Sequence, residues 1–258
     1  MDAADNVIVT GMVEGGPGNW ADFATIKYDA DGVKQWENFY NGPGNEGDVP
    51  VAVTTDAAGN VYVTGSSEGD GTGNDYATIK YSPGGQQLWG RRYNGPGNGT
   101  DEPAALAVDG QGNVYVTGRS QGDGTYYDYA TVKYSPDGKR LWTQRHHGPG
   151  QGADEATALC VDAQGNVYVT GTSYGSGTGM DYATIKYDTN GKKKWGKRYS
   201  SPGENWDGAV AVAVDSQGNV YVTGSSYRNE AFSFDYATLK YDANGKLLWA
   251  RRENKPRL

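Results

Sequence analysis

The sequence predicts an all-β protein built from five similar repeats, and three recurring segments carry the prediction. The segment GNVYVTG occurs four times, and a related DNVIVTG lies near the start of the chain. A segment of the form DYATIKY follows each of these five, and a tryptophan follows each DYATIKY segment. The exact copies of GNVYVTG are 53 residues apart and begin at Gly59, Gly112, Gly165 and Gly218. Such a period indicates a repeat architecture.

The period covers the whole chain, so we expect one repeat array over residues 1–258 without a second domain. The expected repeats span about 1–47, 48–100, 101–153, 154–206 and 207–258.

Each complete repeat has the pattern of four short strands, which we name A to D. In the repeat that begins at Asp101, strand A is the Ala/Val run Ala104–Asp109 and strand B is Asn113–Gly118. Strand C is Tyr129–Tyr134, and strand D surrounds Trp142. Val, Tyr, Thr and Ile dominate these runs, and short glycine-bearing joins separate A from B and C from D, which is typical of tight hairpins. No stretch has apolar residues at helical spacing.

A repeated unit of four antiparallel strands is typical of a β-propeller blade. The pattern AVAVDxxGNVYVTG…DYATIKYxxxGxxxW resembles the bacterial SBBP β-propeller repeat, and its strand layout is similar to that of NHL repeats. This resemblance extends over essentially the whole chain. It implies a five-bladed propeller from an often exported bacterial protein, located outside the cell or at its surface. It implies no shared catalytic residues.

The first repeat lacks strand A, since the chain holds five B–C–D sets but four Ala/Val runs. We therefore expect a first blade without its innermost strand, and an open strand edge at Val7–Thr10. An open edge is a template for another strand, so a neighbouring chain is a candidate partner there. The opening MDAADN aligns with TDAAGN at Thr55–Asn60, so we expect a fragment of a longer array or an altered start.

Charge and composition argue against two classes of partner. The net charge is −8, and an acidic surface repels phosphate backbones, so we expect no nucleic-acid binding. No apolar run is long enough to span a membrane, so we expect no membrane insertion. Cys160 is the single cysteine and has no partner for an internal disulfide.

The residues that recur are expected to be structural. The tryptophans of the period are expected to pack between blades, and the strand B tyrosines are expected to belong to the same scaffold. These residues are Trp36, Trp89, Trp142, Trp195 and Trp249, with Tyr62, Tyr115, Tyr168 and Tyr221.

The loops that differ between repeats are the expected binding surface. In a blade of this topology the B–C and D–A loops emerge on the same face, and here both are long and glycine-rich. Trp206 lies between Asn205 and Asp207, which suits a ring that stacks on a sugar or on a protein side chain; in the alternative, such aromatics merely pin the loops. The candidate binding residues are Trp20, Tyr126, Tyr127, Tyr174, Asn205 and Trp206.

Carboxylates just before strand A suggest a second chemistry. Asp48, Asp101, Asp154 and Asp207 recur at this place, and symmetry would make them a ring that could bind calcium. Against this, no loop matches the D-x-[DN]-x-[DN]-G calcium pattern, and a lone Asp before a strand often caps the adjacent turn.

Enzymatic activity is the contrasting hypothesis. The two histidines, His146 and His147, are adjacent in one D–A loop, and no nucleophile stands at recognisable spacing from a base. We therefore predict a non-enzymatic scaffold or interaction module that binds protein or glycan. The alternatives are a lectin-like glycan binder, a cation-binding propeller and, beyond these, a propeller hydrolase or lyase.

Overall fold

The structure, a computed structural model, describes residues 1–14, 20–201, 206–228 and 233–253. These residues form β-strands joined by turns and contain no helix, which confirms the all-β prediction. It follows that the described part of the chain has no helix long and apolar enough to cross a membrane. The chain divides into two compact units, residues 1–124 with 131–141, and residues 125–130 with 142–258.

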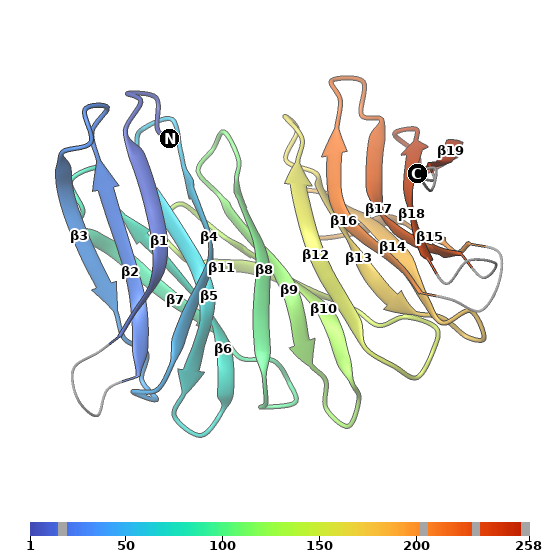
Figure 1. Cartoon of the computed structure of the whole chain (residues 1–258), viewed down its shortest axis with the longest axis horizontal. Coiled ribbons are helices and arrows are strands. Elements are labelled where there is room, and N and C mark those ends of the chain that lie inside the picture. The colour runs from blue at the N-terminus through green and yellow to red at the C-terminus, as the bar shows by residue number, and fades with distance from the viewer. Residues whose placement is uncertain (15–19, 202–205, 229–232, 254–258) are drawn as a thin grey trace. The chain divides into compact units, whose positions relative to one another are not determined.

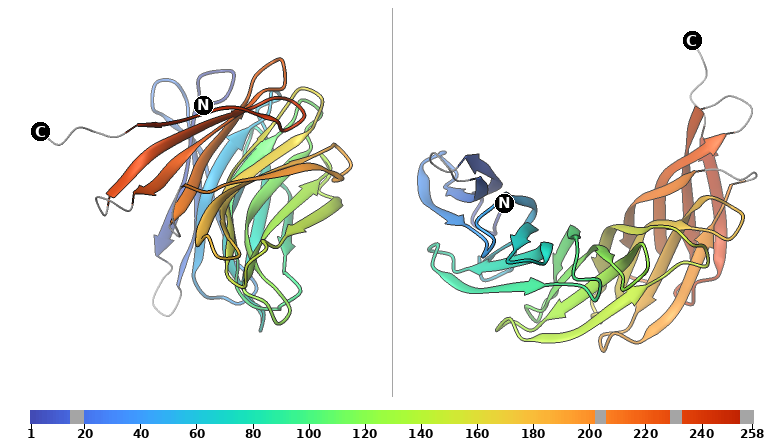
Figure 2. Two further views of the ribbon diagram at one scale, coloured as in Figure 1. Left: turned by 90° about the vertical axis from the view of Figure 1, so that its right-hand side faces the viewer. Right: turned by 90° about the horizontal axis from the view of Figure 1, so that it is seen from below.

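The described strands form five antiparallel sheets, and the strands of each sheet lie side by side in sequence order (Figures 1 and 2). The first sheet holds β1 (Val7–Glu14), β2 (Ala21–Tyr28) and β3 (Lys34–Tyr40). The second holds β4 (Asp48–Thr55), β5 (Val61–Gly69), β6 (Gly73–Tyr81) and β7 (Gln87–Tyr93). The third holds β8 (Asp101–Val108), β9 (Val114–Gln121), β10 (Tyr127–Tyr134) and β11 (Arg140–His146).

The fourth sheet holds β12 (Asp154–Val161), β13 (Val167–Tyr174), β14 (Met180–Tyr187) and β15 (Lys193–Tyr199). The fifth holds β16 (Asp207–Val214), β17 (Val220–Arg228), β18 (Ser233–Tyr241) and β19 (Leu247–Glu253). The three-stranded first sheet confirms that the first repeat lacks strand A. Its edge strand β1 leaves Val7 and Val9 40% and 43% exposed, whereas the equivalent Val61 and Val63 of β5 are fully buried. A partner strand at this edge stays a prediction.

The last residue of GNVYVTG must be glycine because the backbone of the neighbouring strand A passes very close to it. Strand β4 has a bulge between Pro50 and Ala52, where its pairing with β5 shifts. A Cβ on Gly65 would lie 2.2 Å from the Val49 carbonyl oxygen, closer than any side chain can be. The equivalent Gly11 of the first sheet has nothing within 4 Å of such a Cβ, since no strand A lies beside it. Strand A therefore explains the glycine.

Adjacent sheets within each unit are joined by the tryptophan of the period. In the first four sheets the indole N–H donates to a backbone carbonyl in the C–D turn of the next sheet. The pairs are Trp36–Pro83 at 3.0 Å, Trp89–Pro136 at 2.9 Å, Trp142–Thr189 at 3.1 Å and Trp195–Ala243 at 3.2 Å. The turn glycine packs on the indole ring: Gly138 has a φ of +78°, and a Cβ there would lie 2.8 Å from Trp89. These contacts confirm that the tryptophan column packs between blades.

The strand B tyrosines complete the A–B turns. In the third sheet, Asp109 Oδ1 accepts hydrogen bonds from the Gln111 and Asn113 backbone N–H groups. Asp109 Oδ2 accepts from the Asn113 side chain and from the Tyr115 hydroxyl, both at 2.8 Å. Burial by itself would raise the pKa of Asp109, but the hydrogen bonds from Asn113 and Tyr115 outweigh it and hold the pKa below its usual value.

We expect Asp109→Asn to cost about 1 kcal/mol at pH 7, because a charge-assisted acceptor of several hydrogen bonds is lost. The folded-state pKa of Asp109 is lowered, so its contribution is present above the unfolded pKa and is lost as pH falls through the folded pKa. The stability difference between native chain and variant should therefore stay constant from pH 7 to about 5 and shrink as pH falls below the unfolded pKa of about 4. Urea unfolding at several pH values measures it. A difference that does not shrink at low pH would contradict the role given to the charge.

Candidate functional site

The four aspartates proposed as a carboxylate ring lie at the first residue of strands β4, β8, β12 and β16, and all are fully buried. Each binds the start of its own D–A loop by accepting a backbone N–H. The pairs are Asp48–Gly42, Asp101–Gly95, Asp154–Gly148 and Asp207–Ser201, at 2.5–2.6 Å. Burial raises the pKa of Asp48 and Asp154. The carboxylates thus hold their loops, as expected if each aspartate caps the turn next to its strand.

Calcium at these aspartates stays a prediction. In the part of the chain that the structure describes, three side chains that could share a metal ion gather at one place, and Asp154 alone of the four aspartates belongs to that group.

Beneath the loops, an arginine of strand D pairs with the aspartate of the DYATIKY segment. The pairs are Arg92–Asp75, Arg145–Asp128, Arg198–Asp181 and Arg252–Asp235, at 2.8–3.3 Å. The four carboxylates are at most 11% exposed, so the ion pairs are largely shielded from water. In the second, third and fourth sheets they fix the base of the following D–A loop to strand C.

The predicted binding aromatics are mostly exposed. Trp20 is 64% exposed, Tyr126 63%, Trp206 59% and Tyr174 40%. Tyr127, the first residue of β10, is half-buried. Asn205 lies outside the described residues. Tyr174 lies against its own D–A loop, since a Cβ on Gly152 would come within 2.4 Å of its ring, so this aromatic pins the loop.

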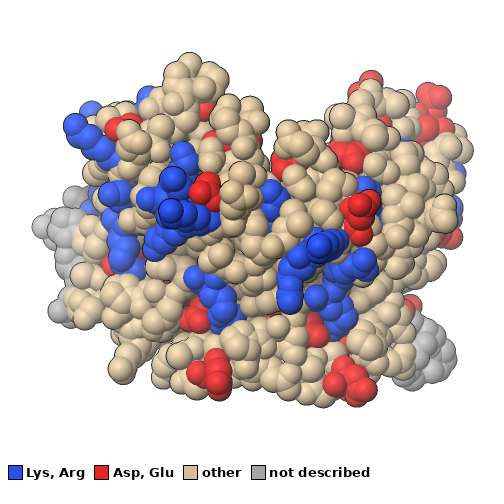
Figure 3. Space-filling view, turned by 180° about the vertical axis from the view of Figure 1, so that it is seen from behind, with Lys and Arg blue, Asp and Glu red and all other residues tan. Residues whose placement is uncertain are grey.

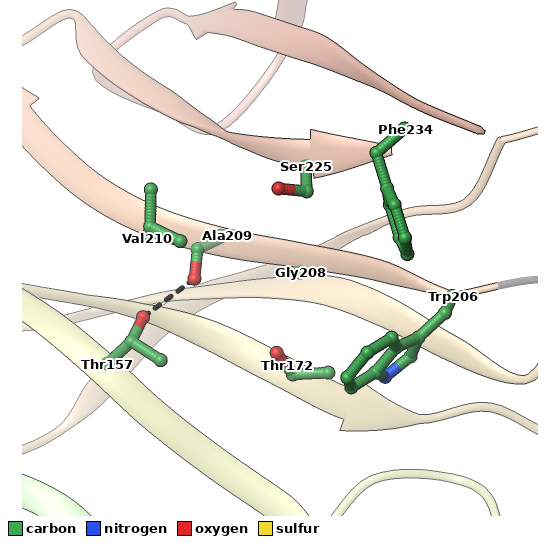
Figure 4. A pocket seen from close by; sticks show the side chains of 8 residues that line it. All are labelled: Thr157, Thr172, Trp206, Gly208, Ala209, Val210, Ser225 and Phe234. Carbon is green, nitrogen blue, oxygen red and sulfur yellow. Dashed lines mark hydrogen bonds between the residues drawn. The ribbon is translucent and has the colours of Figure 1, made fainter. Parts of the chain in front are cut away.

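Trp206 lines an open cavity of about 340 Å³ between the fourth and fifth sheets (Figure 4). Trp206 and Phe234 lie side by side at one end of it, their ring centroids 6.2 Å apart, and both are more than half exposed. The remaining lining residues are Thr157, Thr172, Gly208, Ala209, Val210 and Ser225. The cavity therefore offers mainly apolar surface, with two aromatic rings at its rim.

Few polar groups of this cavity are free to bind. The Thr157 hydroxyl donates to the Ala209 carbonyl oxygen at 2.7 Å, which leaves the hydroxyls of Thr172 and Ser225. Asp207, expected to assist Trp206, is buried and accepts N–H groups from Ser201 at 2.6 Å and Tyr227 at 3.2 Å. Its carboxylate is thus committed to the loop. The sequence pointed to Trp206, but not to this cavity.

The two histidines have different surroundings. The His146 ring packs edge-on against Tyr129, with centroids 5.6 Å apart. Burial, assisted by Lys193 and Arg198, lowers the pKa of His146 to about 4. His147 Nδ1 lies 2.9 Å from Asp128 Oδ1 and 3.6 Å from Asp154 Oδ2. In the sequence, His147 was notable only because it replaces Asn94 of the second repeat. The two aspartates that contact it could not be predicted, because the pairing of strands brings them to it.

Charged side chains are unevenly spread. The fourth strand of each complete sheet carries at least two Lys or Arg residues, although the net charge is −8. On the face seen in Figure 3, Lys and Arg gather in patches, and Asp and Glu lie among them. The expectation that the protein does not bind nucleic acid stays a prediction.

Five antiparallel sheets of three or four strands, repeated at one step, define this chain as a β-propeller repeat protein. A family model described as SBBP, a β-propeller repeat, matches residues 88–124 and 209–229. This match confirms the resemblance predicted from the repeated segments. A search of the curated proteins found no match.

Two solved structures share the fold, and a third is less similar. A eukaryotic initiation factor has a TM-score of 0.54 and 11% identity, with 98% of this chain and 54% of that chain covered. Plexin A of Drosophila, solved with Semaphorin 1b, has a TM-score of 0.50 and 8% identity, with 93% and 54% covered. A glucose dehydrogenase has a TM-score of 0.46 and 10% identity, with 95% and 89% covered.

This chain spans about half the length of the first two structures, as the 54% coverage of each shows. At such identities the likeness shows the fold alone. The prediction that the protein is not an enzyme stays a prediction.

Proposed function

We propose that this protein is a non-enzymatic interaction module whose Trp206 cavity binds an apolar side chain of a partner protein. The observation that carries the proposal is the pair of exposed aromatic rings beside an open apolar cavity. Exposed Trp and Tyr or Phe side chains around a pocket are the usual anchors of a protein interface. The proposal includes an extracellular or cell-surface location, which rests on the resemblance to repeats of exported proteins.

The energetics favour burial of this surface by a partner. Trp206 and Phe234 are 59% and 54% exposed, and Val210 is 61% exposed. Removing apolar surface from water contributes about 25 cal/mol per Å², so a side chain that fills the cavity gains affinity without any charged group. The Thr172 and Ser225 hydroxyls can bond to the backbone of an extended peptide.

A glycan is the second candidate ligand. The face of an exposed Trp stacks on sugar rings, and two hydroxyls line the same cavity. Sugar sites also need several polar groups, however, and the buried Asp207 carboxylate is already bound by two backbone N–H groups. The scarcity of free polar groups therefore favours a protein ligand.

A peptide library displayed on phage, with a glycan array in parallel, tests the proposal. We expect enriched peptides that carry a large apolar residue. Trp206→Ala or Phe234→Ala should weaken their binding about 30-fold or more, as is typical when an anchor is truncated. Tyr126→Ala is the matched control, since Tyr126 is an equally exposed loop aromatic outside the cavity.

Three outcomes separate the alternatives. Sugar hits that depend on Trp206 would replace the protein ligand by a glycan. Peptides that bind Trp206→Ala and the native chain equally would place the contact elsewhere on the loops. Loss of binding in Tyr126→Ala as well would contradict the role of the cavity.

A further inference from the structure

The D–A loop of the third sheet departs from its relatives at His147. In the first two sheets this position is asparagine, and its side chain bonds to a second asparagine in the same loop: Asn41 to Asn45 and Asn94 to Asn98, both at 2.7 Å. In the third sheet the imidazole instead contacts Asp128 of β10 and Asp154 of β12. In this loop Gln151 also replaces the second asparagine, and the histidine joins two aspartates in a group of three side chains of the kind that bind metals.

The separations suit coordination of one ion. His147 Nδ1 is 2.9 Å from Asp128 Oδ1 and 3.6 Å from Asp154 Oδ2, and the three atoms lie within 4.8 Å of one another. In a tetrahedral zinc site, bonds of about 2.0–2.2 Å place neighbouring ligand atoms about 3.3–3.6 Å apart. The imidazole is 47% exposed, so it can adjust its separations from the two carboxylates, and an ion can enter from solvent. The two carboxylate oxygens lie within 4.8 Å of each other, and binding of the ion would draw them together where they are farther apart than a tetrahedral site needs.

The two carboxylates are held in place by other groups. Arg145 Nη2 lies 2.8 Å from Asp128 Oδ2, which leaves Oδ1 for a second partner. Asp154 Oδ2 accepts the Gly148 backbone N–H at 2.6 Å, and Oδ1 accepts that of Tyr174 at 3.1 Å, so an ion would share Oδ2 with the Gly148 N–H. Such supporting hydrogen bonds orient ligands in metal sites.

The equivalent aspartates of the other sheets indicate that a positively charged partner would be favourable at Asp128 Oδ1. The oxygens equivalent to Asp128 Oδ1 are Oδ1 of Asp75, Asp181 and Asp235, and each is buried with no hydrogen-bond donor among the described residues. In the third sheet this oxygen faces His147.

We propose that Asp128 Oδ1, His147 Nδ1 and Asp154 Oδ2 hold a divalent transition-metal ion of the zinc type. An imidazole with two carboxylates suits zinc, whereas calcium prefers six or more oxygen ligands. A fourth position is left to water or to a partner's carboxylate. The ion ties the D–A loop of the third sheet to strands β10 and β12. The site shares Asp154 with the predicted calcium ring, but it adds His147 and Asp128 and uses none of the other three ring aspartates.

Calorimetric titration of the tag-free chain with Zn²⁺ tests the site. We expect one site per chain and a higher melting temperature with zinc. His147→Asn restores the residue of the second sheet, so it should fold, and it should weaken zinc binding at least tenfold. His146→Tyr is the matched control: it installs the residue found at Tyr93 and Tyr199, removes the other histidine, and should bind zinc as the native chain does.

Cobalt supplies a second readout. Co²⁺ bound by the native chain should show the visible absorption of a four-coordinate nitrogen and oxygen site, and His147→Asn should lack it. No heat and no thermal shift with 1 mM Zn²⁺ would overturn the proposal. Equal binding by the native chain and a folded His147→Asn would overturn it too, as would a response to Ca²⁺ alone.

Discussion

Replacing Trp89 with alanine is expected to lower the free energy of unfolding by about 3–5 kcal/mol, the usual cost of truncating a core Trp. Trp89 is 7% exposed, and its ring lies between those of Tyr62 and Tyr134, with centroids 6.2 and 6.1 Å away. Its indole also donates to the Pro136 carbonyl oxygen at 2.9 Å, so the variant loses packing and a hydrogen bond between two sheets. Urea unfolding followed by circular dichroism measures the change.

Leu88→Ala is the control for Trp89, because Leu88 is the preceding residue of the same strand and is 47% exposed. We expect it to cost less than about 1 kcal/mol. Trp142→Ala should cost less than Trp89→Ala, since Trp142 is half-buried. Equal losses for Trp89 and Leu88 would show that the tryptophan column does not join the sheets.

Replacing Arg198 with alanine is expected to cost about 3 kcal/mol. Arg198 Nη2 lies 2.8 Å from Asp181 Oδ2 and donates to the Ser173 carbonyl oxygen at 2.7 Å. The Asp181 carboxylate is 3% exposed, so the variant leaves a buried charge without its cation, which is costly. Thermal and urea unfolding of the variant measure the loss.

Two further variants test this explanation. Lys194→Ala removes an exposed cation of the same strand and should change stability by less than about 0.5 kcal/mol. Adding Asp181→Asn to Arg198→Ala removes the buried charge and should recover part of the loss. A double variant no more stable than Arg198→Ala would mean that lost packing, and not the unpaired carboxylate, explains the cost.

The strands could be predicted because the sequence of each strand recurs in several repeats. Residues that recur at the same position of every repeat must have the same structural role in each. The strand order and the three-stranded first sheet therefore follow from the repeated segments. The bulge beside Gly65 could not be predicted, since the glycine signals a close approach without naming the backbone that approaches. The sequence predicted that Trp89 packs between sheets, but it did not predict that the indole donates a hydrogen bond to the next sheet.

The candidate sites were less accessible to sequence reasoning. Trp206 was marked by its place in a variable loop, but its contact with Phe234 depends on where β18 begins. His147 was noted as unusual, while Asp128 and Asp154 reach it from two other strands. For Asp207, sequence alone could not separate a carboxylate facing solvent from one buried under its own loop. These distinctions depend on burial and pairing.

The bond from each tryptophan to the next turn also bears on how such a chain can change during evolution. In all four pairs the donor is the tryptophan indole and the acceptor is a backbone carbonyl at the equivalent turn position, whatever the residue there, such as Pro83 for Trp36 and Ala243 for Trp195. Any repeat can therefore follow any other without a new interface. Duplication of a gene segment of 53 codons adds a sheet whose contacts already fit on both sides, and deletion of one removes a sheet cleanly. Array length can thus vary by whole repeats, while loop residues such as His147 diversify one repeat at a time.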